Sequence, residues 1–477
     1  MTHFFSTTAL CAMAFFSNAV LALPHDIEKI HSTLLPQVRI TGEQYKPHTV
    51  DAAMATFNLP GLSVAVIKNA EVVWAKGYGV ANKKTGRPVT TDTLFQAASI
   101  SKPIAALAVL NLAEQGKVNL DTDINTYLKS WKMPSSEFGI VTLRHLLTHS
   151  SGLAHQPSPG YLRGAPIPSD VASLNGEGNT NKVAANFKAG SQFRYSTDGY
   201  AILDVLIEDI TGRTFSEYVD KTILEPLSMN QSTFAQPLPK ALWQQASAAF
   251  DAQGNQIQGD WRNYPKQSAA GLWTTPLDLA KYIIAVQKAK KGTTTGPITP
   301  KLVENMLSLH LGGMGLGPML KNEKQGLVFH HSGKSAGFSN RFHAYVDKAD
   351  GMVIMTNGDS ARPVVGQLQN AISAHFNWDL SAHIEVTPYA MDNAKRADLV
   401  GEYAWEKDTS KRMRIVKQGD EFEIHNLFEG GQFKFIAEAP DTLISTSTGV
   451  KVNIETNPQG KVTAILWSGR FRLNKRL

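Results

Sequence analysis

The sequence predicts an α/β protein of the α+β type: an antiparallel sheet flanked by helices with a helical region, plus a small C-terminal all-β, barrel-like domain. Three observations support this. Apolar strand patterns occur near residue 61 and again between residues 326 and 355, and helical patterns lie between them. After about residue 394 the pattern changes to short alternating runs. This order fits a single sheet that is formed by the early and the late strands and covered by the helices that lie between them in the sequence.

Length and composition allow a large folded protein. The chain has 477 residues, which predicts more than one folding unit. Hydrophobic residues make up 42% and charged residues 18%, unlike the composition of a disordered protein. The net charge is +6, without any run of five or six like charges. We therefore expect a globular protein with no nucleic-acid partner.

The N-terminus carries an apolar stretch, Ala9–Ala22, that is too short to span a bilayer. It ends in small residues suited to a signal peptidase, so we interpret residues 1–22 as a cleaved export signal. The protein would then be periplasmic or secreted, with no stable membrane span. The alternative is an uncleaved N-terminus packed on the core. Cys11 is the only cysteine, which excludes an internal disulfide and a multi-cysteine metal site.

The first predicted elements are a hairpin and a buried helix. From Gly61 two apolar, β-branched runs flank residues 68–70, which is typical of two strands joined by a turn. Ile104–Ala113 is apolar on nearly every face and predicts a buried helix with Gly116 at its C-terminal stop. Pro103 is tolerated in the first turn, because an N–H there has no helical partner.

A long loop and then further helices and strands follow. Ala154–Gly190 is rich in Pro, Gly, Ser and Asn, and loops of this length usually carry function or disorder. Helical periodicity returns at Tyr200–Ile210 and at Pro276–Val286. Alternating patterns then predict the strands Gly326–Phe329, Phe342–Val346 and Met352–Met355.

The tail from Leu399 to Leu477 consists of short alternating runs separated by turn residues such as QGD, EGG and NPQG. Strands at this spacing predict a small all-β barrel or sandwich. We place the main domain at residues 23–390 and a small, lipocalin-like β-barrel domain at residues 395–477.

The most informative motif for chemistry is Ser99-Ile100-Ser101-Lys102 at the start of the buried helix. A spacing of three puts the Ser99 hydroxyl and the Lys102 ammonium on one helical face. Desolvation beside a buried helix favours neutral lysine, which can take the serine proton. The Ser99 N–H at a helix N-terminus could stabilise an oxyanion. The alternative is a serine near a helix cap with a solvated lysine.

Two further motifs follow in order along the chain. Tyr195-Ser196-Thr197 precedes a helical pattern, and His331-Ser332-Gly333 leads from a strand into a Gly-Phe pair. The order and spacing resemble the serine β-lactamase and penicillin-binding protein superfamily, in the branch of class C β-lactamases, D-alanyl-D-alanine carboxypeptidases, D-aminopeptidases and related esterases. The strings PGLSVAVIKN, LRHLLTHSSGL and AAGLWTTPLDLAKY add to the match, which spans Pro60–Gly358. The resemblance implies a site between an antiparallel sheet and a helical region.

The resemblance also implies roles for these residues. Ser99 would be the acylated nucleophile, Lys102 its base partner and Tyr195 the phenol that passes a proton to or from the leaving group.

On the strand, His331 stands where many relatives have lysine, and it would present a polar or cationic group to Tyr195 and the substrate. Gly333 would permit close backbone approach, and the N–H of Lys334 would be the second oxyanion donor.

Thr197 departs from the pattern of the family, which usually reads Tyr-x-Asn. An amide offers two donors and an acceptor, whereas a threonine hydroxyl offers one donor. Binding of acylamido substrates, including β-lactams and peptides, is therefore in doubt.

Residues 333–337 (GKSAG) also fit the GxSxG pattern of α/β-hydrolases, which would make Ser335 a nucleophile. That fold needs a helix directly afterwards. The alternation that follows predicts two strands and a turn instead, so we do not expect Ser335 to be the nucleophile.

Two other groups are assigned structural roles. His145 and His149 lie one helical turn apart, but no acidic third ligand is near, so we expect packing histidines and no metal site. Asp198 and Glu208-Asp209 are expected to cap or solvate helices.

The sequence thus predicts an exported serine hydrolase that works through an acyl-enzyme on Ser99, without metal or organic cofactor. The substrate would be a small molecule or a peptide, with esters, amides, D-amino-acid peptides and cell-wall fragments all left open. The alternatives are a catalytically weak penicillin-binding or scaffold protein of the same fold, and a class C-like β-lactamase.

Overall fold

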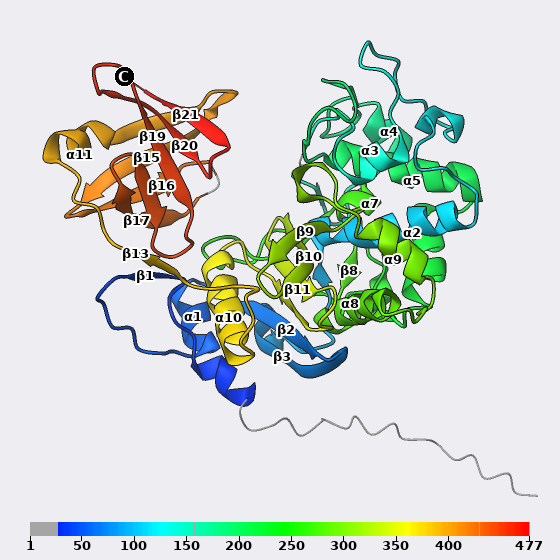
Figure 1. Cartoon of the computed structure of the whole chain (residues 1–477), viewed down its shortest axis with the longest axis horizontal. Helices are drawn as coiled ribbons and strands as arrows, with labels where there is room; N and C mark the ends of the chain where they lie inside the picture. The colour runs from blue at the N-terminus through cyan, green and yellow to red at the C-terminus, as the bar shows by residue number, and fades with distance from the viewer. Residues whose placement is uncertain (1–26, 157, 429, 477) are drawn as a thin grey trace, which may run out of the picture.

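The computed structural model describes residues 27–156, 158–428 and 430–476 (Figure 1). The predicted export signal at residues 1–22 lies outside this range. Among the helices of the described ranges, none has the length and apolar character needed to cross a membrane.

A seven-stranded sheet organises the main domain. Its strands are β2 (Gly61–Lys68), β3 (Glu71–Asn82), β4 (Arg87–Pro88), β9 (Met319–Glu323), β10 (Gly326–Ser335), β11 (Phe338–Tyr345) and β12 (Gly351–Thr356). The order is β4-β3-β2-β12-β11-β10-β9, and every neighbouring pair is antiparallel. The early hairpin joins the late strands through β2 and β12, which confirms the predicted sheet.

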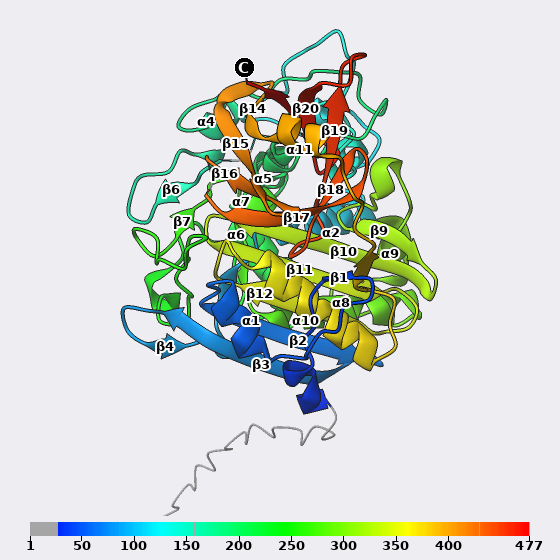
Figure 2. The ribbon, with the colours of Figure 1, turned by 90° about the vertical axis from the view of Figure 1, so that its left-hand side faces the viewer.

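Helices cover both faces of this sheet (Figures 1 and 2). On one face lie α1 (Val50–Thr56) and α10 (Arg362–His375), packed on Leu62 and Val64 of β2. Ala65 and Ile67 of the same strand face the helical region on the other side. Both faces of β2 are therefore buried, which explains its continuous apolar run.

The helical region contains the remaining helices of the main domain. They are α2 (Ser101–Glu114), α3 (Leu143–Leu147), α4 (Asp170–Leu174), α5 (Thr197–Thr211), α6 (Phe215–Val219), α7 (Gln267–Ala270), α8 (Pro276–Lys290) and α9 (Pro300–Met306). Helix α2 is buried along nearly its whole length, and Gly116 follows its end with φ +70°. The predicted buried helix and its stop are confirmed, with a start three residues before Ile104.

Short elements connect these parts. They are η1 (Ile27–Ser32), η2 (Ala98–Ile100), η3 (Ile124–Thr126), η4 (Asp220–Leu224), η5 (Lys240–Leu242), η6 (Leu311–Gly313) and the strands β5 (Phe95–Gln96), β6 (Tyr161–Leu162), β7 (Arg262–Asn263) and β8 (Trp273–Thr274). β5 pairs with β8 and β6 pairs with β7, both antiparallel.

The C-terminal part is a closed eight-stranded barrel, entered through α11 (Asn393–Leu399). Its strands are β14 (Gly401–Trp405), β15 (Asp408–Gln418), β16 (Glu421–Asn426), β17 (Gln432–Ala439), β18 (Thr442–Ser445), β19 (Lys451–Thr456), β20 (Val462–Trp467) and β21 (Phe471–Lys475). Each strand pairs with its neighbour in the chain, and β14 pairs with β21 to close the ring. The barrel-like domain is confirmed.

A small parallel sheet links the barrel to the main domain. β1 (Val38–Ile40) pairs with β13 (Ile384–Val386). Val38 and Val386 pack in one apolar cluster with Ile436 and Ile444 of the barrel. The barrel is thus held by segments from both ends of the main domain, and Figure 1 shows these two strands beneath it.

Candidate active site

Ser99 lies in the single turn η2, directly before α2. The preceding Ala98 has φ 50°, a left-handed conformation that residues with a side chain rarely adopt. Two contacts hold this bend: the Ala97 N–H donates to Leu272 O at 2.8 Å, and the Leu272 N–H donates to the Ser101 hydroxyl at 3.0 Å. Ser99 is partly exposed, whereas its neighbours are buried. Strain held in this way is common where a reactive side chain must be fixed.

Lys102 is fully buried beside Ser99. Its Nζ donates to Ser99 Oγ at 3.1 Å and to Ala269 O at 2.8 Å. Burial, and then the charge of Lys266, lowers the pKa of Lys102 to about 7. A large share of Lys102 is therefore a neutral amine near pH 7, able to accept a proton from Ser99.

Tyr195 closes the group from the side of α5. Its ring centroid lies 5.0 Å from Lys102 Nζ. Burial raises the pKa of Tyr195, and a hydrogen bond with Ser99 offsets only part of that rise. Tyr195 is thus a neutral phenol with a proton to give. The structure brings Ser99, Lys102 and Tyr195 together as their spacing predicted.

His149, which the sequence assigns to packing, also contacts this group. Its ring centroid lies 4.1 Å from that of Tyr195, with the planes tilted by 35°. Its Nδ1 accepts from the Ser196 N–H at 3.1 Å, and burial holds the pKa of His149 well below its usual value. A neutral His149 therefore supports the Tyr195 ring. In the described residues no three His, Cys, Asp or Glu side chains gather in a way that could hold a metal ion.

The strand β10 supplies the opposite wall. β9 pairs with β10 only as far as His330, whereas β11 pairs along to Ser335. One edge of β10 is therefore free of β9 beyond His330. A Cβ on Gly333 would lie 2.0 Å from Ala97 O and 3.1 Å from Ser99 N. Only glycine permits this close approach of β10 to the Ser99 turn.

His331 is buried on this strand. Its Nδ1 lies 2.7 Å from Ser332 O, and its ring centroid is 6.3 Å from that of Tyr195. Burial lowers the pKa of His331 to about 3, with the charge of Lys102 as the second cause. Of the two predicted forms, polar or cationic, the neutral polar one fits this environment.

The Lys334 side chain is exposed to solvent. Its Nζ lies 4.0 Å from Asp359 Oδ1, at the limit of an ion pair. The bulk of Lys334 is thus on the solvent side. Its N–H remains the predicted second oxyanion donor.

Thr197 begins α5, and its hydroxyl is bonded in both directions. It accepts from the Gln156 N–H at 3.0 Å and donates to Gln156 O at 3.1 Å. The Gln156 side chain is also committed, since its Nε2 donates to Asp198 Oδ2 at 2.7 Å and its Oε1 accepts from the Asn181 N–H at 2.9 Å. The single donor of the Thr197 hydroxyl is therefore used on Gln156 O and is not available to a substrate amide.

An ion pair that the sequence did not indicate lies beside the site. Asp198 Oδ1 is 2.7 Å from Lys266 Nζ, and both side chains are buried. The expectation that Asp198 caps or solvates its helix is wrong, because Ser196 is the N-cap of α5 and Lys266 draws the carboxylate inward. Lys266 immediately precedes α7, whose Ala269 O holds Lys102. No local pattern around Lys266 indicates this position.

The GxSxG alternative does not fit the structure. Ser335 ends β10, and β11 begins at Phe338 with no helix between them. Its hydroxyl donates to Gln96 Oε1 at 3.4 Å and also contacts the Tyr264 side chain. Among the described residues, Ser335 has no histidine partner that could activate it.

The chain was compared with known proteins. A family model described as Beta-lactamase matches residues 48–375. The chain belongs to the beta-lactamase family. All three motifs lie inside the matched segment, so the family resemblance inferred from them is confirmed.

Two proteins that are similar in sequence to this chain are an esterase and protein flp. Esterase EstB of Burkholderia gladioli is 32% identical over 200 residues, covering 40% of this chain and 51% of EstB. Protein flp of Staphylococcus aureus strain MW2 is 26% identical over 353 residues, covering 69% of this chain and 66% of flp. The chain spans about half the length of EstB and 42% of flp from strain N315.

Solved structures of the same fold also align with the chain. An octameric penicillin-binding protein homologue from Pyrococcus abyssi aligns with a TM-score of 0.62 and 24% identity, over 89% of this chain and 98% of that one. A D-alanine carboxypeptidase AmpC from Burkholderia cenocepacia aligns with a TM-score of 0.55 and 19% identity, over 67% of this chain and 96% of that one. At this identity the likeness establishes the fold alone.

Proposed function

We propose that this protein is a serine hydrolase that forms an acyl-enzyme on Ser99. The observation that carries the proposal is the 3.1 Å contact between Ser99 Oγ and the Nζ of a fully buried lysine, Lys102, whose pKa is lowered to about 7. Family membership supports hydrolase chemistry in general.

Acylation would begin with proton transfer from Ser99 to neutral Lys102. Ser99 Oγ then bonds to the carbonyl carbon of the substrate, and the carbonyl oxygen becomes an oxyanion facing the Ser99 and Lys334 N–H groups. The bond to the leaving group breaks as Tyr195 donates a proton to it, and Tyr195 recovers its proton from Lys102.

Deacylation would reverse these roles with water as the nucleophile. Water loses a proton to the Lys102–Tyr195 pair and bonds to the acyl carbon. The bond from that carbon to Ser99 Oγ breaks, and Oγ takes back a proton. The acid product leaves, and the Lys102–Ser99 hydrogen bond forms again.

Small esters are the substrates that we propose for this site. An ester needs no amide anchor, and the hydroxyl of Thr197 is already bonded to Gln156 in both directions. The similarity to an esterase, EstB, adds support. β-Lactams and peptides would lack the amide contact that the asparagine of other family members offers.

Exchange of Thr197 tests this substrate class. Thr197→Asn is expected to raise the kcat/KM for the cephalosporin nitrocefin relative to that for p-nitrophenyl butyrate by about tenfold, the value of one added hydrogen bond. Thr197→Val, which adds no amide, is the matched control and should give no such gain. Efficient nitrocefin hydrolysis by the unaltered protein would contradict the proposal.

The pH dependence tests the base. The kcat/KM for an ester should rise as pH increases through about 7, because Lys102 must lose its proton to act. The nearby Lys266 cation lowers the pKa of Lys102. The double variant Lys266→Met/Asp198→Asn removes this cation, so the rising limb of the plot of kcat/KM against pH should move to higher pH. Lys221→Met, which removes a surface cation paired with Glu225, is the control and should leave the limb in place. A limb unmoved in the double variant would show that Lys102 is not the titrating base.

We also propose that the protein is exported with removal of residues 1–22, so that its substrates are met in the periplasm or outside the cell. Small molecules, peptides and cell-wall fragments remain the candidate substrate partners. N-terminal sequencing of the protein recovered from the periplasm and the medium tests the export step, and a mature protein that starts at Met1 would contradict it.

A further inference from the structure

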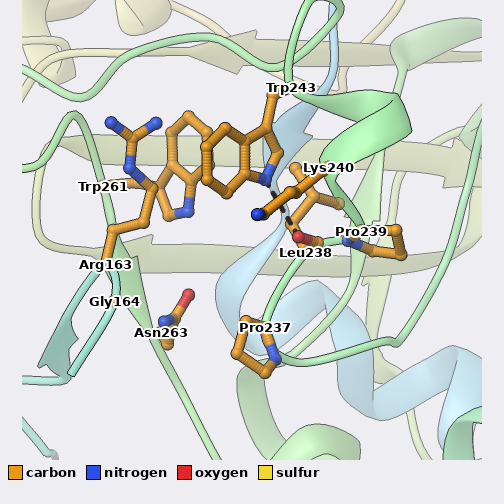
Figure 3. A pocket seen from close by; sticks show the side chains of 9 residues that line it. All are labelled: Arg163, Gly164, Pro237, Leu238, Pro239, Lys240, Trp243, Trp261 and Asn263. Atoms are coloured by element: carbon orange, nitrogen blue, oxygen red, sulfur yellow. Dashed lines mark hydrogen bonds between the residues drawn. The ribbon is translucent and has the colours of Figure 1, made fainter. Parts of the chain in front are cut away.

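The short helix α7 is the element that holds the reacting side chains from behind. Its Ala269 O accepts from Lys102 Nζ at 2.8 Å, and Leu272, two residues after its end, bonds to the turn that carries Ser99. The chain reaches α7 from β7, where Asn263 borders a cavity of about 420 Å³ (Figure 3). A helix of four residues has few internal hydrogen bonds, so the position of α7 depends on contacts with its neighbours.

Those contacts come from α5. Asp204 of α5 is fully buried, and its Oδ1 accepts from the Ser268 N–H of α7 at 2.9 Å. The Ser268 hydroxyl donates to Tyr200 O at 2.6 Å. Lys266, directly before α7, is paired with Asp198 at 2.7 Å. The mechanism proposed above assigns no step to Asp204, although this residue caps the helix that holds Lys102.

Asp204 lies in surroundings that favour its neutral form. Its Oδ2 has no hydrogen-bond partner in the parts of the chain that the structure describes. Burial raises the pKa of Asp204 well above its usual value, the charges of Asp170 and Glu208 raise it further, and the hydrogen bonds with Ser268 offset only part of that rise. Near neutral pH Asp204 is therefore a neutral acid whose carbonyl oxygen accepts from Ser268. Asparagine keeps this acceptor and has a similar shape, so it is the conservative substitute.

We propose that Asp204 is a positioning residue of the hydrolase: it holds α7 through the Ser268 N–H, and α7 holds the Ala269 carbonyl against Lys102. This inference rests on the proposed roles of Ser99 and Lys102. Asp204 touches neither the substrate nor the reacting atoms, and it acts on the base only through α7.

Loss of this anchor should change Lys102 in a defined direction. A carbonyl acceptor stabilises the ammonium form of lysine more than the amine, so withdrawal of Ala269 O should lower the pKa of Lys102 below its value of about 7. Lys266 should stay in place, because its ion pair with Asp198 does not involve Asp204. The other titratable side chains near Lys102 are unaltered in variants of Asp204, namely Lys266, Tyr195, Tyr200, His149, His155 and His331.

The test measures Lys102 directly and through turnover. Nuclear magnetic resonance of the full-length protein with ¹³C-labelled lysine follows the titration of Lys102, whose signal is assigned by its absence in Lys102→Met. Asp204→Leu should lower the pKa of Lys102 by about half a unit. It should also lower kcat for p-nitrophenyl butyrate by about tenfold, the value of one hydrogen bond, with little change in KM. Turnover is expressed per Ser99 titrated with a fluorophosphonate, so a smaller folded fraction does not count as lost chemistry. Asp204→Asn should keep both values.

Asp209→Leu is the matched control. Asp209 also lies on α5 and accepts from a backbone N–H, that of Ser130, at 3.0 Å, in a loop that does not contact the site. Its loss should lower the temperature of unfolding but leave the pKa of Lys102 and kcat per titrated site unchanged. A purely structural role of Asp204 would give this same result for Asp204→Leu.

Three results would overturn the proposal. They are an unchanged pKa of Lys102 in folded Asp204→Leu, an equal shift in Asp204→Asn, and an equal shift in Asp209→Leu. If Asp204→Leu does not fold, as judged by circular dichroism, Asp204→Ala takes its place, and failure of both to fold would show that the bond serves folding alone. Failure of the proposed function would appear separately, as absent labelling at Ser99 in the unaltered protein. The resonance titration needs no turnover and would still decide the role of Asp204.

Discussion

Ser99→Ala is expected to abolish covalent labelling by a fluorophosphonate and to lower ester hydrolysis by about 10⁴-fold or more. The variant removes the hydroxyl oxygen that lies 3.1 Å from Lys102 Nζ and that would carry the acyl group. Intact-protein mass spectrometry after exposure to the reagent, followed by peptide mapping, measures this directly. In the unaltered protein the adduct should lie on the peptide that contains Ser99.

Ser335→Ala is the matched control for this experiment. Ser335 lies at the end of β10 and is the serine of the alternative GxSxG motif. Its removal should leave labelling at Ser99 intact. An adduct on Ser335 in the unaltered protein would contradict the assignment of the nucleophile.

The second large effect is expected for Lys102→Met. Methionine fills a similar volume in the buried space between Ser99 and Ala269 but cannot accept a proton. We expect kcat to fall by about 10²- to 10⁴-fold, the usual contribution of a general base, while KM changes much less. Steady-state kinetics with a p-nitrophenyl ester, alongside a thermal unfolding curve, separate lost chemistry from lost folding.

Tyr195→Phe extends this test to the proton donor. The ring contact with His149 at 4.1 Å does not need the phenol hydroxyl, so the fold around the site should remain. A loss in kcat of similar size is expected, whereas Lys221→Met on the surface should keep normal turnover. Near-normal turnover in Lys102→Met and Tyr195→Phe together would rule out the mechanism.

Much of the fold was predictable because its signals are local. The hairpin of β2 and β3 is encoded by two apolar runs and a turn in which Asn69 and Ala70 take φ 54° and 61°. The tail contains one alternating run for each barrel strand. The closure of β14 on β21, in contrast, joins residues at opposite ends of the tail, and no local pattern distinguishes a closed barrel from a sandwich.

The site was predictable only where a motif marks it. Ser99 and Lys102 share one helical turn, so their contact follows from spacing alone. The contacts of His149 with Ser196 and of Asp198 with Lys266 join residues 47 and 68 positions apart. Such contacts arise from tertiary packing. This is why Asp198 was expected to cap or solvate its helix and its pairing with Lys266 was not predicted.

The strand order of the main sheet also governs how the molecule is made. Ile67 of β2 pairs with Gly351 of β12. During synthesis, the β2 edge of the first hairpin therefore has no partner strand until most of the chain has left the ribosome. An exposed apolar edge is a template for aggregation. The barrel strands pair with their chain neighbours and close within one short stretch, which favours rapid folding. The slower folding steps are therefore expected in the main domain, and the barrel should complete its fold soon after its own synthesis.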